Sequence, residues 1–157
     1  MIDTAVFRQL CGRFPTGVVV LTTTADDGRP VGMTANSFTS VSLDPPLVSI
    51  NVDHHAAMHR HMARAERFAL NVLESRQEAL SRRFAGELPD RFDGVGFSLS
   101  ERGLPLLHGV LATLECTRHT AFEAGDHTIV VGEVTAGSVG DGRPLLYYRG
   151  GYYDLPT

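Results

Sequence analysis

Two stretches, VLATLECTRHTA (Val110–Ala121) and TIVVGEVTAGS (Thr128–Ser138), decide the fold. Polar and apolar residues alternate along both of them, as they do in strands that have one buried face. The sequence between them includes Glu123-Ala124-Gly125-Asp126, which is a turn signal. We therefore predict two long antiparallel strands that pair around this turn.

A second hairpin is predicted nearer the N-terminus. Val18–Ala25 is rich in β-branched residues, Asp26-Asp27-Gly28 is a turn signal, and a further strand runs from Pro30 to about Thr34. Segments of similar composition predict three more strands, at Leu47–Val52, Phe68–Val72 and Leu145–Arg149. Proline and glycine mark two irregular segments, a turn at Leu43–Pro46 and a loop-rich connection over Glu87–Pro105.

Helices are predicted in the gaps between these strands. Asp3 or Thr4 caps the first, which extends through Phe14 and gathers its apolar residues on one face: Val6, Phe7, Leu10, Cys11 and Phe14. The second covers Ala56–Ala65 and the third covers Gln77–Phe84.

Hairpins dominate this arrangement of about six or seven strands and two or three helices, and no βαβ rhythm repeats. The order of elements favours an antiparallel β-barrel with helical insertions over a doubly wound sheet. There is no internal repeat and no low-complexity linker, so we expect one domain over residues 1–157.

The composition is that of an ordinary globular chain of 157 residues, 43% hydrophobic and 20% charged. Fourteen basic and eighteen acidic residues give a formal charge of −4, and the two signs are interspersed. Neither nucleic acid nor a membrane surface is therefore an expected partner. No apolar run approaches the ~20 residues of a membrane span, and no signal-peptide core is evident, so we expect a soluble cytoplasmic protein.

The two cysteines, Cys11 and Cys116, form no CxxC pair and no cluster of the kind that binds metal. A reducing cytosol is the simple interpretation. Cys11 falls among the apolar positions of the first helix, and Cys116 alternates with apolar residues in a strand. We expect both thiols to be buried packing residues.

The segment GMTANSFTSVS (Gly32–Ser42) has an unusual composition, since seven of its eleven residues are Thr, Ser, Asn or Gly. A planar heteroaromatic ligand needs donors and acceptors along one edge and small residues that allow close approach. This segment supplies both. A polar barrel strand with one face in solvent would have the same composition, so the alternative remains open.

A second candidate segment is GDHTIVVGEV (Gly125–Val134), in which Asp126 and His127 come just before an apolar strand. This position is the rim of the predicted barrel, where a histidine can contact a substrate amide or a developing charge. A solvated rim histidine is the alternative.

A third segment, DHHAAMHRH (Asp53–His61), holds four of the seven histidines. His55 and His59 are four residues apart, a spacing that can hold zinc on one helix face. However, no Glu falls between them and no third ligand is evident, so the sequence predicts no metal site. An anion site at the helix N-terminus is favoured over metal, and a solvated polar helix is the plain alternative.

Other catalytic signatures are missing from the sequence. The serines Ser37, Ser40 and Ser42 have no GxSxG context, which argues against a hydrolase. The glycine-rich stretches contain no GxGxxG or GxxxxGK motif, which argues against Rossmann and P-loop nucleotide sites.

Taken in order, these segments resemble the short-chain flavin reductases that have the FMN-binding split-barrel fold and serve as reductase partners of two-component flavin-dependent monooxygenases. The resemblance extends over nearly the whole chain. Five motifs carry it: FPTGVVVLTT (Phe14–Thr23), GMTANSFTSVSLDPPLV (Gly32–Val48), RFALNVL (Arg67–Leu73), LSRRFAG (Leu80–Gly86) and GDHTIVVGEV (Gly125–Val134).

The resemblance implies a flavin-binding site built from separate segments. Cofactor-binding positions along the isoalloxazine ring and ribityl chain would be Met33, Thr34, Ala35, Asn36 and Ser37. Those near the pyrimidine edge of the ring would be Ser40, Val41 and Ser42. Those near the phosphate would be Asn51 and the start of the following helix, and the pair packing near the flavin would be Phe84 and Ala85.

The same resemblance places Gly125, Asp126 and His127 at the nicotinamide side, with His127 as the residue that seats the nicotinamide. One departure concerns the phosphate. Many relatives carry Ser or Thr where this chain has Ala56-Ala57, so His59, Arg60 or backbone N–H groups would substitute.

The activity implied is hydride transfer from NADH or NADPH to FMN or FAD, by a homodimer that supplies reduced flavin to a partner monooxygenase. Little protein acid–base chemistry is required, because the cofactors carry the reaction. Two alternatives remain: a split-barrel flavoprotein such as a pyridoxamine-phosphate-oxidase-like oxidase or an FMN carrier, and a non-catalytic dimeric binding module.

Overall fold

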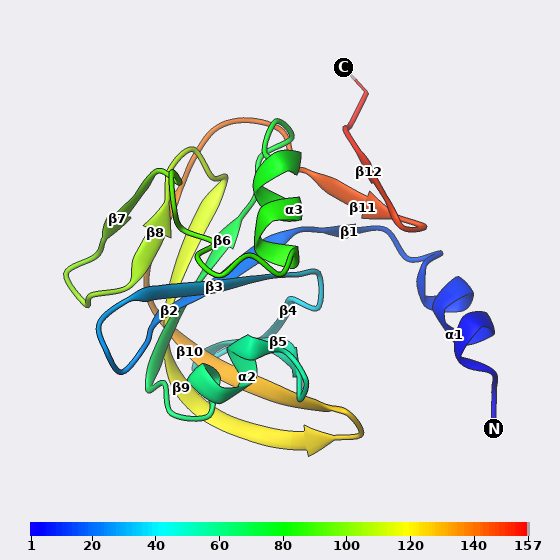
Figure 1. Ribbon diagram of the computed structural model, residues 1–157, viewed down its shortest axis with the longest axis horizontal. Coiled ribbons are helices and arrows are strands. Elements are labelled where there is room, and N and C mark those ends of the chain that lie inside the picture. The colour runs from blue at the N-terminus through cyan, green and yellow to red at the C-terminus, as the bar shows by residue number, and fades with distance from the viewer. Residues whose placement is uncertain (157) are drawn as a thin grey trace.

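The computed structural model describes residues 1–156, and one curled antiparallel sheet forms its centre (Figure 1). Seven strands make up this sheet in the order β3-β2-β6-β9-β10-β5-β4. Their bounds are β2 Val19–Thr24, β3 Pro30–Ala35, β4 Thr39–Leu43, β5 Pro46–Asp53, β6 Arg67–Val72, β9 Ala112–Ala124 and β10 His127–Val139. The predicted antiparallel barrel is confirmed. It is split, because within residues 1–156 the end strands β3 and β4 do not pair with each other.

Two small sheets flank the barrel. One contains β1 (Thr16–Gly17), β11 (Leu146–Tyr148) and β12 (Gly151–Tyr153), and the other pairs β7 (Phe97–Leu99) with β8 (Pro105–Leu107). The sequence predicted β2, β3, β5, β6, β9, β10 and β11 to within a few residues. It missed β1, β4, β7, β8 and β12, which are short, and β4 is also largely exposed and lies at the edge of its sheet.

The helices are α1 (Thr4–Cys11), α2 (Ala57–Met62) and α3 (Glu78–Ala85). Asp3 caps α1, because its Oδ1 accepts hydrogen bonds from the backbone N–H groups of Ala5 at 2.8 Å and Val6 at 3.3 Å. The first two are shorter than the sequence predicts, and α3 has the predicted length but is shifted by one residue toward the C-terminus. No helix within residues 1–156 combines the length and the apolar character that crossing a membrane requires.

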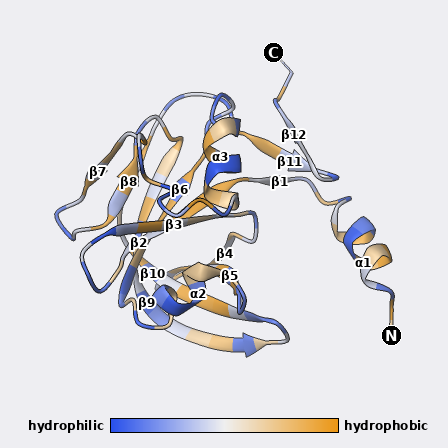
Figure 2. Cartoon of the chain, viewed as in Figure 1, coloured by the Kyte–Doolittle hydropathy of each residue, from blue (hydrophilic) through white to orange (hydrophobic). Residues whose placement is uncertain are grey.

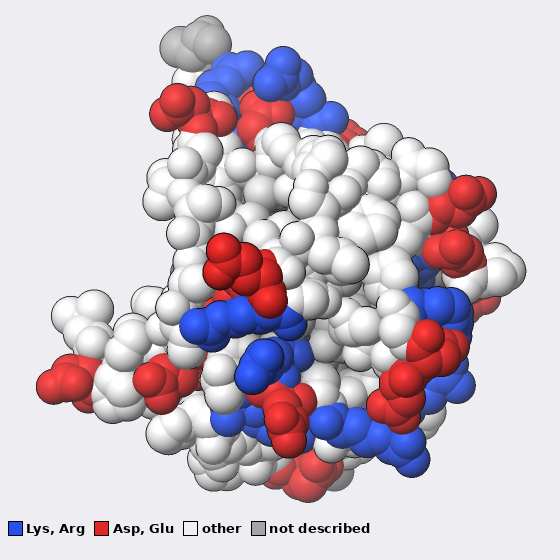
Figure 3. Space-filling model, turned by 90° about the vertical axis from the view of Figure 1, so that its left-hand side faces the viewer, with Lys and Arg blue, Asp and Glu red and all other residues white. Residues whose placement is uncertain are grey.

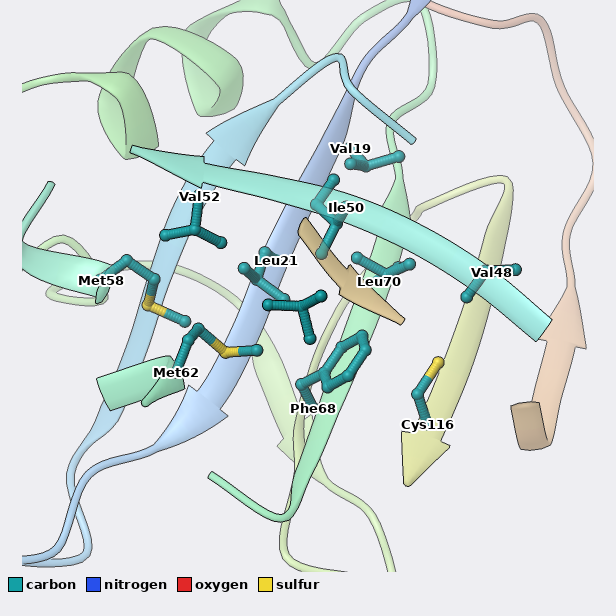
Figure 4. Packing of buried hydrophobic residues seen from close by; sticks show 11 residues of the cluster. Val19, Leu21, Val48, Ile50, Val52, Met58, Met62, Phe68, Leu70 and Cys116 are labelled. Atoms are coloured by element: carbon teal, nitrogen blue, oxygen red, sulfur yellow. The ribbon is translucent and has the colours of Figure 1, made fainter. Parts of the chain in front are cut away.

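The main core fills the barrel and is closed at the split by α2, which buries Met58 and Met62 (Figure 4). The remaining buried members of this cluster are Val19, Leu21, Val48, Ile50, Val52, Phe68, Leu70, Cys116 and Val130. A second cluster on the other face of β2 contains Val18, Val20, Leu73, Phe84, Phe92, Leu107 and Leu145. Because β2 is covered on both faces, its apolar residues form a continuous run instead of alternating.

Asn71 is a fully buried polar residue that links three strands of this core. Its side-chain N–H groups donate to the Val20 carbonyl at 3.0 Å and to the Thr22 hydroxyl at 3.1 Å, while its side-chain oxygen accepts from the Leu107 N–H at 2.9 Å. Each of these groups would cost about 1–3 kcal/mol if it were buried without a partner. The amide therefore fixes how β6 lies between β2 and β8.

The two cysteines have different surroundings. Cys116 is buried as predicted, and burial, together with the nearby charge of Glu115, raises the pKa of its thiol to about 12. Cys11 is exposed, so the prediction that it is buried was wrong. The reason is that α1 stands apart from the barrel (Figure 2), and none of its residues is buried by the other residues that the structure describes.

Gly132 allows a close approach inside the barrel. A Cβ atom at this position would lie 2.5 Å from Cζ of Phe68 and 2.8 Å from Cβ of Cys116. The register of β10 against β9 shifts between Val131 and Gly132, so the glycine also lies at a bulge.

We expect Gly132→Ala to lower the free energy of unfolding by about 1–3 kcal/mol, because the added methyl group overpacks the core against the Phe68 ring. Urea unfolding measures this as a lower midpoint with an unchanged slope. Gly17→Ala is the matched control, since a Cβ there meets nothing within 4 Å. Equal midpoints for the two variants would contradict the proposed tight packing at Gly132.

Candidate functional site

A cleft of about 1400 Å³ lies between α1 and the barrel. Its barrel side is formed by the start of β2, the β3–β4 connection and the middle of β5. The other side is formed by α1 and by residues around β11. The lining residues used below are Phe7, Phe14, Asn36, Ser37, Asn51 and Arg149. A cleft of this size with polar groups on one wall and aromatic rings on the other can hold a planar heteroaromatic ligand.

Ser37 ties the β3–β4 connection to β5. Its Oγ accepts a hydrogen bond from the Asn51 N–H at 3.0 Å, and it lies 3.4 Å from the Asn51 carbonyl oxygen. Asn36 is exposed beside it and lines the same wall of the cleft. Three of the predicted site residues are thus brought together here.

The preceding residues of β3 are oriented differently. The Thr34 hydroxyl donates to the Ser81 carbonyl of α3 at 2.6 Å, so its proton is already used within the chain. Met33 and Ala35 are partly buried against the main core. The side chains of Met33, Thr34 and Ala35 therefore pack within the chain and do not line the cleft.

Four further predicted residues lie outside the cleft lining. Ser40, Val41 and Ser42 are on β4, the edge strand, where the register against β5 shifts between Ser40 and Ser42. Ala85 is exposed at the end of α3.

Phe84, the last core residue of α3, is fully buried in the second cluster. Its ring packs against Gly32, where a Cβ atom would lie 2.9 Å from Cε1 of the ring. The Phe84 ring on α3 therefore packs against β3, and the lack of a side chain at Gly32 allows this close approach.

The strand register places the rim histidine on the same face as the cleft wall. Asn51 pairs with Ile129, and Asp53 pairs with His127, on adjacent antiparallel strands β5 and β10. Paired residues point to the same face of a sheet, and so do residues two apart along a strand. His127 is therefore one diagonal step from Asn51, about 7–8 Å between backbones.

Asp126 holds the ring of His127, with Nδ1 of the histidine 2.7 Å from Oδ1 of the aspartate. This hydrogen bond, and then the charge of His127, lowers the pKa of the Asp126 carboxyl group. The turn between β9 and β10 needs a left-handed residue, which Gly125 supplies at φ +63°. The ring nitrogen Nε2 of His127 makes no hydrogen bond to another of the described residues 1–156.

His59 is directed elsewhere. Its Nε2 lies 3.0 Å from the Thr128 hydroxyl, and Thr128 is adjacent in sequence to His127 and Ile129, so its side chain is on the opposite face of β10. The structure therefore separates His59 from Asn51 by the thickness of the sheet.

Sequence analysis missed several residues that the structure brings to these places. Phe7, Phe14 and Arg149 reach the cleft from the two ends of the chain, and no local pattern linked them to the GMTANS segment. Glu123 was read only as part of a turn, yet it lies on β9 directly opposite Thr128. Pairing the two predicted strands residue by residue across their turn would have indicated that Glu123 lies opposite Thr128.

Charged residues of both signs lie intermingled on the face shown in Figure 3. All fourteen basic residues are arginines, and several are paired with a neighbouring carboxylate, as Arg64 is with Asp26 at 2.7 Å and Arg82 with Glu78 at 2.8 Å. This face offers no extended positive surface of the kind that a nucleic acid backbone requires.

Comparison with known proteins identifies what this geometry is similar to. The family described as "Flavin reductase like domain" matches residues 11–156. Stachydrine N-demethylase reductase subunit Stc3 of Rhizobium meliloti is 45% identical over 153 residues, which are 98% of this chain and 66% of that protein. The reductase component of flavin-dependent trigonelline monooxygenase of Acinetobacter baylyi is 43% identical over 146 residues, 93% of this chain and 47% of that protein. The chain thus spans about two thirds of the length of the first relative and slightly less than half of the second.

A solved structure matches this chain over almost its whole length. The NADH:FAD oxidoreductase SgcE6 of Streptomyces globisporus, in complex with NAD and FAD fragments, has a TM-score of 0.93 and 43% identity to this chain. The match covers 99% of this chain and 96% of that one.

Proposed function

The chain belongs to the flavin reductase-like domain family, and from this premise we propose that it reduces FMN or FAD with NADH or NADPH and releases the reduced flavin to a partner monooxygenase. The observation that carries the proposal is the cleft wall of Asn36, Ser37 and Asn51, with His127 one step along the same face. Family membership alone does not define what this chain does with a bound flavin, because one fold can host several uses of that cofactor.

The residues on this face fit a flavin. Asn36 offers a side-chain amide that both donates and accepts, as the edge of an isoalloxazine ring requires. Ser37 holds the connection against β5, so the backbone donors and acceptors of that connection are positioned before the ligand arrives. Phe7 and Phe14 on the opposite wall supply apolar surface for a flat ring.

The predicted roles divide into contact and support. We assign Asn36, Ser37 and Asn51 to contact with the flavin, and Met33, Thr34, Ala35 and Phe84 to support of the strand that carries them. Edge-strand residues Ser40, Val41 and Ser42 and helix-terminal Ala85 would meet the flavin only from outside this cleft.

At the nicotinamide side we assign Gly125, Asp126 and His127. The hydrogen bond from Nδ1 to Asp126 leaves Nε2 of His127 directed outward, where it can bond the amide of a nicotinamide. The nicotinamide supplies a hydride and the flavin accepts it, so the chain itself has only to bind, orient and exclude water. The cytoplasm, where reduced nicotinamide cofactors are available, is the proposed location.

Anaerobic mixing of the protein with NADH and either FMN or FAD tests the proposed function. We expect flavin-dependent loss of the nicotinamide absorbance, and the flavin that gives the larger kcat/KM is the preferred one. NADPH in place of NADH fixes the choice of donor. Flavin binding without loss of NADH or NADPH would instead support the oxidase or carrier alternative, and no flavin binding at micromolar concentration would support the non-catalytic module.

His127→Ala should raise the KM for NADH about tenfold, or slow hydride transfer by a similar factor, because it removes one hydrogen bond of ~1.4 kcal/mol to the nicotinamide. Stopped-flow kinetics with saturating flavin separates the two effects. His108→Ala is the matched control, since that ring bonds Ser98 in the β7–β8 sheet, away from the cleft. Kinetics equal to those of the control would remove His127 from the site.

We further propose that the chain forms a homodimer through α1. Two apolar residues of this helix that do not line the cleft, Val6 and Leu10, are exposed in the single chain, with 45% and 59% of their surface accessible. A helix with an apolar stripe is stable when another surface covers that stripe. Because α1 also forms one wall of the cleft, a second copy seated on it would complete the flavin site.

Leu10→Glu should convert the dimer to a monomer, because it places a charge in the middle of the apolar stripe. Sedimentation equilibrium measures the change. Leu99→Glu is the control, since Leu99 is 63% exposed on β7, which is not part of the proposed contact. A wild-type monomer, or a Leu10→Glu variant that remains dimeric, would contradict a dimer built on α1.

A further inference from the structure

Three side chains that are far apart in the sequence converge at the end of the barrel where β9 and β10 turn. They are His54, at the end of β5, His59 on α2 and Glu123 on β9, and their possible ligand atoms all lie within 4.8 Å of one another. This is the combination of two imidazoles and one carboxylate that zinc binds in open sites.

The geometry within the cluster is close to that of a metal site. Nε2 of His54 lies 2.7 Å from Oε2 of Glu123, and the two imidazole rings meet edge to face with centroids 4.9 Å apart. Ligand atoms on a tetrahedral zinc ion are about 3.3 Å from one another, given zinc–ligand bonds of about 2.0–2.1 Å. The three atoms, which lie within 4.8 Å of one another, would reach that spacing by rotation of their side chains.

One buried atom of the cluster lacks a hydrogen-bond partner. Nε2 of His54 is shielded from solvent, and despite its short distance to Glu123 its direction does not make a hydrogen bond. A buried polar atom whose one close contact is not a well-directed hydrogen bond is a place where a bound ion can complete the environment. Coordination of a cation would satisfy it.

Thr128 orients the carboxylate as a supporting residue. Its hydroxyl donates to Oε1 of Glu123 at 3.0 Å, and that leaves Oε2 turned toward His54. The same hydroxyl oxygen lies 3.0 Å from Nε2 of His59, so it links the carboxylate to the second imidazole. Hydrogen bonds of this kind around a metal site fix the direction of its ligands.

We infer that His54, His59 and Glu123 form a binding site for a transition-metal dication of the zinc class, with solvent in the remaining position. Glu123 is 73% exposed on its side chain, so an ion can enter from water. Imidazole and carboxylate ligands select zinc, cobalt or nickel over calcium or magnesium. The cluster lies on the opposite face of β10 from His127, so this inference does not rest on the proposed flavin chemistry.

A bound ion would tie three elements together at the rim. The backbone N–H of His54 already donates to the Asp126 carbonyl at 3.0 Å, so the loop after β5 is in contact with the turn that carries the GDH motif. Coordination would add a second connection between that loop, α2 and β9. Because an ion of this kind binds the folded state alone, it would also raise the midpoint of thermal unfolding.

Titration of the untagged, chelator-treated protein with cobalt(II) tests the site, because a tetrahedral cobalt ion has visible absorption bands that need neither flavin nor activity. We expect one cobalt ion per chain at micromolar affinity and displacement of it by zinc. Glu123→Gln and His59→Ala should each weaken binding at least tenfold. Glu123→Gln changes an exposed group and is the variant that should keep the native fold, which circular dichroism checks.

His55→Ala is the matched control, because that ring is 90% exposed and contacts Asp53 instead of the cluster. It should bind cobalt as the wild type does. No bound cobalt in the wild type, a loss of less than tenfold in Glu123→Gln, or equal weakening in His55→Ala would overturn the proposal. Flavin reduction is measured separately, so its failure would leave the cobalt result standing.

Discussion

The structure depends on the double pairing of β10, which is hydrogen-bonded to β9 on one side and to β5 on the other. A strand held on both sides cannot slip by one residue without turning every one of its side chains to the wrong face. This constraint puts Val130 into the barrel core and leaves His127 and Ile129 on the outer face, beside Asp53 and Asn51. The position of the rim histidine relative to the cleft is thus a consequence of register.

The same register separates two kinds of chemistry. The outer face carries amide, hydroxyl and imidazole groups next to an open cleft, which suits a large planar ligand. The inner face at the same end carries Thr128 between Glu123 and His59, in a cluster too small for such a ligand and well shaped for an ion. The adjacent residues His127 and Thr128 of β10 point to opposite faces of the sheet. The short turn at Gly125 connects their strand to β9, which carries Glu123.

Much of this fold was predictable because period-two alternation is strong wherever a strand has one buried face. It failed for β4, which pairs with only one neighbour, so that even its apolar residues Val41 and Leu43 are exposed and no buried face marks the strand. It also failed for α1 in the opposite sense. The apolar stripe that includes Leu10 and Cys11 predicted burial, yet none of the helix is buried among the described residues. An amphipathic pattern shows that a helix needs a partner surface, but it does not show whether that surface belongs to the same molecule.

The candidate site was predictable only where its residues were local. Asn36 and Ser37 stand in one unusual segment, whereas the cluster at the barrel rim was hidden by a misleading spacing. His55 and His59 are four residues apart, but α2 begins only at Ala57, so His55 is outside the helix and the two rings do not share a face. The pair that meets is His54 with His59, because β5 ends just before His54 and turns its ring toward the helix. Spacing along a chain identifies ligands within one helix. Ligands contributed by a strand end, a helix and a cross-strand neighbour become visible only when the register of the sheet is known.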